Sequence, residues 1–185
     1  MKLKLDLHTH CFEALYVPSS KWITPIIVGK IVASVKAKGL DGIAVTEHQQ
    51  KEFGFVAKSI ISEQFNNEVV IIPGREIYLH GIHVVELFLP NKTTFRFIPH
   101  PTYLEHLENN FDFSRIHGIE IDNHCYDQHI DKPGVRAIAE KHNLLLMSNS
   151  DAHDINNVGH YYNYIDLEDL FNRAEPHTEH EVYDY

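Results

Sequence analysis

The chain has 185 residues, a formal net charge of −10 and 43% hydrophobic residues, with aromatic residues at 11%. This length and apolar content predict one folded domain with a sizeable core. The net negative charge argues against long nucleic acid as a partner, because such binding depends on cationic side chains that neutralise phosphates.

Cysteine content and apolar runs limit the expected compartment. Cys11 and Cys125 are the only cysteines and show no pairing pattern, so we expect no disulfide framework and a cytoplasmic location. The N-terminus reaches Asp6 almost at once and no apolar run approaches bilayer length. We therefore expect neither a signal peptide nor a membrane partner.

Short apolar runs alternate with helical patterns along the chain. Strands are predicted at 2–8, 42–48, 69–77, 83–89, 96–100, 118–123 and 144–153. Helices are predicted at 24–38, 52–66, 101–109, 133–142 and 166–173. Thr24 is the expected N-cap of the first long helix, with Pro25 in its first turn and Gly39 at its end. This alternation favours strand–helix units around a mainly parallel sheet.

No linker or internal repeat divides the chain. We therefore predict a single domain over 1–175, followed by an acidic tail at 176–185. Tyr161, Tyr162 and Tyr164 alternate in "YYNYI", which favours a final strand over a surface that stacks on an aromatic substrate. His177 and His180 have possible metal-ligand spacing, but a solvated tail is the preferred interpretation.

Several predicted strands end in histidine or a carboxylate. These residues are His8, His10, Glu47, His48, Glu76, His83, His100, Glu120, Asp151 and His153. In parallel α/β folds the carboxyl ends of the strands meet at one edge. Imidazole and carboxylate without thiolate suit zinc, manganese or iron. Alternatively, these could be unrelated buried histidines. That interpretation requires a histidine or carboxylate to stand at the end of several strands by chance.

The ordered motifs resemble those of the PHP (polymerase and histidinol phosphatase) superfamily of metal-dependent phosphoesterases. The motifs are "DLHTH", "VTEH", "PGREI", "IPHP", "GIEIDN" and "SNSDAH", and they extend over most of the chain. The resemblance implies an α/β fold, a distorted seven-stranded (β/α)7 TIM-like barrel. It also implies two or three divalent metal ions (Zn, Mn or Fe) at the carboxyl mouth.

The same resemblance assigns ligands. One ion would be held by His8, His10, Glu76 and Asp151, with Glu76 as a bridge. A second would be held by His48 and His153, and a third by Glu76, His83 and His100. Glu13 stands near the place where the family usually has another Asp or His ligand, and Glu47 replaces an Asp in the second motif.

Other polar residues of the motifs have supporting roles in this interpretation. Asp6 and Asn123 are expected to orient ligands by hydrogen bonds. Glu120 could either orient a ligand or bind metal. Cys11 lies beside His10, where a small buried residue is preferred over a metal ligand.

The expected chemistry is hydrolysis of a phosphate ester by a metal-bound hydroxide. Asp151 and His153 are the expected catalytic residues, and His153 or a metal-bound water would protonate the leaving group. Arg75 could pair with substrate oxygens, although an ion pair with a carboxylate at the barrel rim is an equal alternative. Weaker candidates are Arg96, Arg115 and Arg136.

The leading function is hydrolysis of a small phosphorylated metabolite or nucleotide. A nuclease for short or single-stranded oligonucleotides and a non-catalytic, metal-stabilised domain that binds a protein are the alternatives. Segment 11–23 is interpreted either as a lid, with Tyr16 and Trp22 facing substrate, or as packing on the barrel rim.

Overall fold

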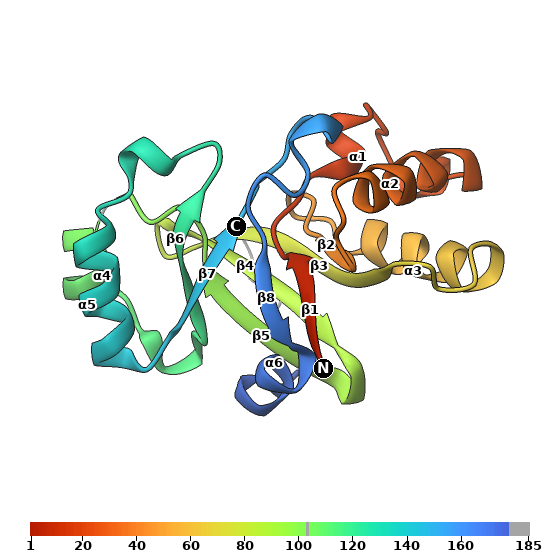
Figure 1. Cartoon of the computed structure of the whole chain (residues 1–185). Helices are drawn as coiled ribbons and strands as arrows, with labels where there is room; N and C mark the ends of the chain where they lie inside the picture. Colours follow the sequence, from red (N-terminus) through yellow and green to blue (C-terminus); the bar gives the residue numbers. More distant parts are fainter. Residues whose placement is uncertain (103, 178–185) are drawn as a thin grey trace.

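A curved sheet in the strand order β7-β6-β5-β4-β3-β2-β1-β8 forms the centre of the molecule (Figure 1). The computed structural model describes residues 1–102 and 104–177. The strands are β1 (Lys2–Asp6), β2 (Gly42–Val45), β3 (Val70–Leu79), β4 (Ile82–Leu89), β5 (Thr93–Ile98), β6 (Gly118–Asn123), β7 (Leu145–Asn149) and β8 (Asn163–Asp166). A short β9 (Glu175–Pro176) pairs with β5 outside this order.

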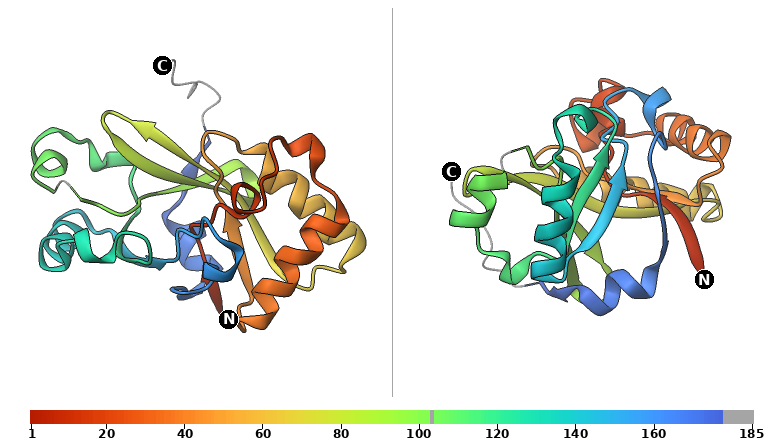
Figure 2. Two further views of the ribbon diagram at one scale, coloured as in Figure 1. Left: turned by 90° about the horizontal axis from the view of Figure 1, so that it is seen from above. Right: turned by 60° about the vertical axis from the view of Figure 1, so that its left-hand side comes forward.

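Helices cover the sheet in two groups. α2 (Pro25–Ala37) and α3 (Glu52–Gln64) lie on one side, and α4 (Leu104–Asn110) and α5 (Lys132–His142) lie on the other (Figures 1 and 2). The short α1 (Cys11–Ala14) follows β1, while α6 (Leu167–Arg173) lies at the opposite end of the barrel. This arrangement leaves the carboxyl ends of the parallel strands at one face.

The expected start of α2 is confirmed. Thr24 accepts a hydrogen bond from the Ile27 amide at 3.4 Å, Pro25 opens the helix, and Gly39 follows it with φ +65°. A hydroxyl side chain at the N-cap stabilises the start of a helix, and a glycine with positive φ after the last turn stabilises its end. The other predicted strands and helices lie within a few residues of their expected ranges.

Two hairpins replace crossover helices in the middle of the chain, so the expected (β/α)7 arrangement of mainly parallel strands is wrong in this region. β4 is antiparallel to both β3 and β5. His80 and Gly81 join β3 to β4 with φ values of +47° and +88°, and a two-residue link of this kind can only reverse the chain. β8 is also antiparallel to β1.

The two ends of the strand order meet through one side chain. Asn163 on β8 accepts from the Ser148 amide at 2.9 Å and donates to the Ser148 carbonyl at 2.9 Å. The same amide group donates to the Asn149 side chain at 2.7 Å and to the Leu5 carbonyl at 3.3 Å. Asn163 thereby joins β7 to β1 and β8, which makes the sheet nearly closed.

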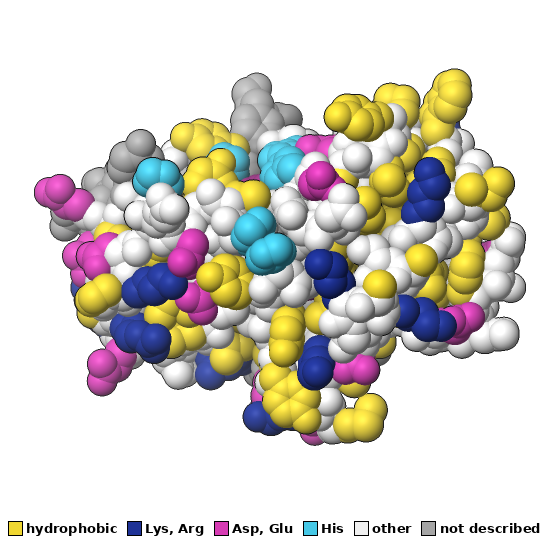
Figure 3. Space-filling model, turned by 45° about the horizontal axis from the view of Figure 1, so that its top comes forward, with side chains coloured by type: hydrophobic (Ala, Val, Ile, Leu, Met, Phe, Trp, Pro, Cys, Tyr) yellow, Lys and Arg dark blue, Asp and Glu magenta, His cyan; other side chains and the backbone are white. Residues whose placement is uncertain are grey.

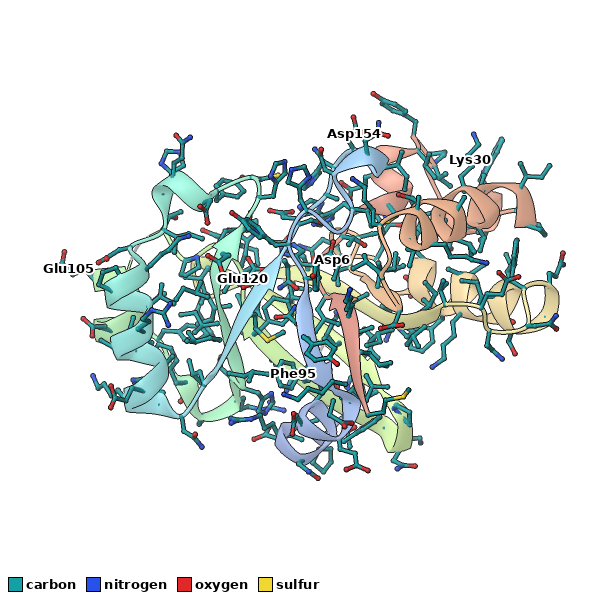
Figure 4. All side chains as sticks on the ribbon, in the orientation of Figure 1. Asp6, Lys30, Phe95, Glu105, Glu120 and Asp154 are labelled. Atoms are coloured by element: carbon teal, nitrogen blue, oxygen red, sulfur yellow. The ribbon has the colours of Figure 1, made fainter. Side chains whose placement is uncertain are left out.

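Apolar residues fill the barrel below the polar strand ends. Phe95, Phe97, Leu87 and Met147 are fully buried there (Phe95 is labelled in Figure 4), and Leu170 of α6 closes the far end. Polar strand ends at one face and an apolar interior below them confine any polar site to the carboxyl face. Over residues 1–102 and 104–177, every helix falls short of the length and apolar character that a bilayer crossing requires.

Replacing Asn163 with alanine tests the closure of the sheet. The variant leaves the Ser148 amide and carbonyl and the Asn149 side chain without this partner, so the free energy of unfolding should fall by about 2–4 kcal/mol. Urea unfolding followed by circular dichroism measures the change. Asn172→Ala, at an exposed position of α6, is the matched control and should change stability by less than about 0.5 kcal/mol. Equal stability of both variants would contradict a closing role for Asn163.

Candidate metal centre

Ends of separate strands place histidine and carboxylate side chains at the same face of the molecule. His8 and His10 follow β1, His48 follows β2, and Asp151 and His153 follow β7. Glu76 lies on β3, His83 lies near the start of antiparallel β4, and His100 follows β5. Histidine side chains accordingly gather near the middle of this face (Figure 3).

The deepest group consists of His8, His10, Glu76 and Asp151. Five distances join His8 Nε2, His10 Nε2, Glu76 Oε2 and Asp151 Oδ1, and they range from 3.1 to 3.5 Å. Four ligand atoms at typical zinc distances from a tetrahedral ion are about 3.3 Å apart. The four side chains are at most 2% exposed, and within the group His8, His10 and Glu76 bring three ligand atoms close enough together to hold one ion.

Hydrogen bonding in this group supports a cation between the four atoms. His8 Nδ1 lies 3.0 Å from Glu120 Oε1, and a proton on Nδ1 leaves the Nε2 lone pair directed at carboxylates. Among the described residues, Asp151 Oδ1 and His10 Nδ1 are buried without a hydrogen-bond partner. Lone pairs that converge in this way are stabilised by a bound cation.

The charges of these residues are strongly coupled. Burial by itself would lower the pKa of His10, but the adjacent carboxylates of Asp151 and Glu76 outweigh burial and raise the pKa to about 9. The pKa of His8 is likewise raised, because the neighbouring carboxylates outweigh its burial. Burial would raise the pKa values of Glu76 and Asp151, but the facing histidines hold both below their ordinary range. In the absence of a metal, protons supply the positive charge of this group.

The two oxygens of the Glu76 carboxylate face different sets of candidate ligands. Its Oε2 faces His8, His10 and also His48 Nε2, which is 3.3 Å away. Its Oε1 contacts His83 Nδ1 at 2.5 Å and His100 Nε2 at 3.1 Å. A carboxylate with both oxygens engaged in this way is suited to bridge metal ions.

A second group contains Glu13 with His10, His48 and His153. Glu13 lies 2.9 Å from His48 Nδ1, and this hydrogen bond outweighs partial burial and lowers the pKa of Glu13 to about 2. The rings of His48 and His153 both stack against His10, with centroids 4.3 and 4.2 Å from it and 5.6 Å from each other. The structure thus places Glu13 beside His10, His48 and His153.

Glu47 positions this second group without joining it. Its carboxylate accepts from the amides of Phe12 at 2.8 Å and Glu13 at 3.1 Å. Burial outweighs these hydrogen bonds and raises the pKa of Glu47 to about 7. Glu47 therefore fixes α1, which presents Glu13 to His48.

Glu120 orients ligands through both of its oxygens. Oε1 faces His8 Nδ1 and accepts from the Asn149 side chain at 2.8 Å. Oε2 accepts from the His100 amide and from the Asn123 side chain, each at 2.8 Å. Because four partners surround this buried carboxylate, its geometry is that of a group that orients ligands rather than one that binds an ion.

Asp6 holds backbone rather than ligand side chains. It accepts from the amides of Ser150 at 3.1 Å and Gly159 at 2.8 Å (Asp6 and Glu120 are labelled in Figure 4). Burial raises the pKa of Asp6 to about 6 despite these hydrogen bonds. Sequence reasoning missed Asn149 and Asn163, although Asn149 lies inside the "SNSDAH" motif at the end of a strand.

Arg75 is not brought into the site. Strand alternation places it on the face of β3 opposite Glu76, where Nε donates to Glu86 Oε2 at 2.7 Å. The ion-pair interpretation therefore fits Arg75, and the expected contact with substrate does not. Of the weaker candidates, Arg96 also pairs with Glu86, at 2.9 Å, and Arg115 pairs with Glu175 at 3.3 Å. Arg136 is exposed on α5.

The remaining candidates lie outside the described metal-ligand groups. Cys11 is buried and donates to the Thr9 hydroxyl. Tyr16 and Trp22 are exposed, so neither packs closely on the rim. Tyr162 and Tyr164 are exposed, and lysines lie over both rings. His180 and the rest of 178–185 lie outside the described residues.

Comparison with known proteins finds a similar fold among solved structures. No protein-family model matches the chain, and no curated protein sequence matches it. A crystal structure from Bifidobacterium adolescentis, described as a "putative metal-dependent phosphoesterase", matches with a TM-score of 0.65 and 11% sequence identity. The match covers 91% of this chain and 96% of that chain. At this identity the likeness shows that the two chains share a fold.

Proposed function

We propose that the chain is a metal-dependent phosphoesterase that hydrolyses a small phosphate ester. The observation that supports this proposal is the convergence of His8, His10, Glu76 and Asp151 at the spacing of metal ligands, next to further histidines that share Glu76. The matching fold of a protein described as a phosphoesterase is consistent with it. The proposed ligands are His8, His10, Glu13, His48, Glu76, His83, His100, Asp151 and His153.

Hydrolysis adds one water molecule across the ester bond. The water oxygen bonds to phosphorus, the P–O bond to the leaving group breaks, and the leaving oxygen receives a proton. Divalent ions, when bound, activate water and neutralise charge on phosphoryl oxygens.

Residues around the candidate centre orient the proposed ligands and supply an imidazole that can exchange a proton. Glu120, Asn123 and Asn149 fix the orientations of the ligands through hydrogen bonds. His153 Nδ1 lies 3.0 Å from the Asp151 carbonyl oxygen. A proton on Nδ1 donates to that carbonyl and leaves Nε2 able to bind an ion or accept a proton. The pKa of His153 is lowered by burial and by His10, which keeps the imidazole neutral for either role.

Metal content is the first test. Protein purified without chelators should contain two or more equivalents of a divalent metal, measured by inductively coupled plasma mass spectrometry. Because the pKa of His10 is about 9 without metal, binding at pH 7 must displace its proton. Zinc titrations of the metal-depleted protein, made by calorimetry in two buffers of different ionisation enthalpy, should show proton release. Protein with neither bound metal nor proton release would rule out the proposed centre.

The second test replaces Asp151 with asparagine. Asp151 has φ +52°, a conformation that asparagine tolerates, so the variant removes the charge and keeps the backbone. Hydrolysis of p-nitrophenyl phosphate or bis-p-nitrophenyl phosphate should fall by at least about 100-fold, and the preferred ester separates monoesterase from diesterase. Asp169→Asn, at an exposed position of α6, should behave like wild type. Full activity in Asp151→Asn would contradict the assignment.

The third test separates Glu13 from the deepest group. Glu13→Ala removes the partner of His48, so metal content should fall by one equivalent while His8, His10, Glu76 and Asp151 stay loaded. Glu63→Ala, on the exposed side of α3, should keep the wild-type metal content. If Glu13→Ala also keeps it, Glu13 only orients His48 and is not a ligand.

A further inference from the structure

A pocket of about 650 Å³ opens beside two of the candidate ligands. Three segments form its walls: the tip of the β3–β4 hairpin, the chain between β5 and α4, and the loop after β6. The residues that line it are Tyr78, Gly81, Ile82, His83, Ile98, Pro99, His100, Pro101, Thr102, Leu107, Tyr126 and His129. The volume lies within the range of about 300–1,000 Å³ that is typical of small-molecule sites.

The pocket adjoins one side of Glu76. His83 and His100 both line the pocket and contact Glu76 Oε1. The second group, with Glu13, lies toward Glu76 Oε2 through His10 and His48. A phosphate held at the candidate metal centre therefore has this pocket on its His83 and His100 side.

Apolar and aromatic side chains form part of the pocket walls, beside His83, His100, His129 and Thr102. Ile82, Ile98 and Leu107 line it, together with the rings of Tyr78 and Tyr126, which are both exposed. The Tyr126 ring lies 4.5 Å from the His100 ring, centroid to centroid. Among the described residues that line the pocket there is no Lys, Arg, Asp or Glu. The apolar and aromatic side chains favour a flat ring, and a charged group finds no lysine, arginine or carboxylate partner among these described residues.

Cationic side chains line a different pocket. Lys51, Lys58 and Lys92 surround Phe55 and Phe88 on the outer face of the sheet. Phe88 is on the face of β4 opposite the interior Leu87, because neighbouring residues of a strand point to opposite faces. A second anionic group on a substrate thus finds no lysine in the pocket beside His83 and His100.

We propose that the pocket beside His83 and His100 receives the leaving group of the ester and selects an uncharged aromatic or heteroaromatic ring. This inference rests on the proposed phosphoesterase function. Tyr126 forms one wall of the pocket, and its ring stacks on or packs against the bound ring.

Three esters with alkoxide leaving groups of similar basicity test this selection. Benzyl phosphate should be hydrolysed with a kcat/KM at least about tenfold above those of glycerol phosphate and 4-carboxybenzyl phosphate. Tyr126→Ala should raise KM for benzyl phosphate about tenfold, and its kcat/KM for benzyl phosphate should fall relative to that for glycerol phosphate. Tyr126→Phe should restore the wild-type KM, and Tyr164→Ala, on the exposed face of β8, should have no effect.

Binding of benzyl alcohol to the metal-loaded protein provides a readout that does not depend on hydrolysis. Saturation-transfer NMR should detect binding to wild type and to Tyr126→Phe, with affinity reduced at least about fivefold in Tyr126→Ala. Circular dichroism confirms that the variants are folded. Binding with this pattern, in protein that hydrolyses no ester, would support the ring pocket and overturn the proposed function. Equal kcat/KM for the three esters, unaffected by Tyr126, would overturn the pocket and leave the function standing.

Discussion

One carboxylate organises the polar end of this barrel. Glu76 is 2% exposed and contacts five imidazoles, three through Oε2 and two through Oε1. A buried carboxylate is costly unless positive charge surrounds it. The histidines supply that charge only while they hold protons, whereas bound divalent ions would supply it and leave the imidazoles neutral. Five candidate ligands contact this side chain, so the charge of Glu76 is coupled to the protonation of most of the histidines of the site.

A continuous hydrogen-bond chain connects this site to the closure of the sheet. Asn163 at the seam donates to Asn149, Asn149 donates to Glu120, and Glu120 accepts from His8. The Asn149 oxygen also accepts from the Leu7 amide at 2.9 Å, just before the first histidine. The same asparagines that join β7 to β1 therefore orient a candidate ligand. Stability of the barrel and order at the metal centre are coupled for this reason.

Much of this arrangement could be predicted from local sequence. The caps of α2, the strand "GIEIDN" and the polar ends of the strands depend on nearby residues, so pattern alone located them. The antiparallel direction of β4 depends on the His80–Gly81 turn. In the sequence, the short link between the two strands was the feature that indicated a hairpin. The orientation of Arg75 followed from strand alternation, but its partner Glu86 lies on another strand. The seam at Asn163 joins residues far apart in the chain, which no local pattern encodes.

The two sides of Glu76 differ in access to solvent. The side chains of His8, His10, Glu76 and Asp151 are at most 2% exposed, whereas those of His48, His83 and His153 are 40–47% exposed. An ion in the deepest group would be surrounded by protein and would contribute mainly to holding the strand ends together. A substrate can reach only the outer positions. Since the exposed histidines on one side are backed by charged Glu13 and those on the other by apolar and aromatic walls, the site is polar on one side and apolar on the other. Under the proposed function, that asymmetry would orient a bound ester in one direction.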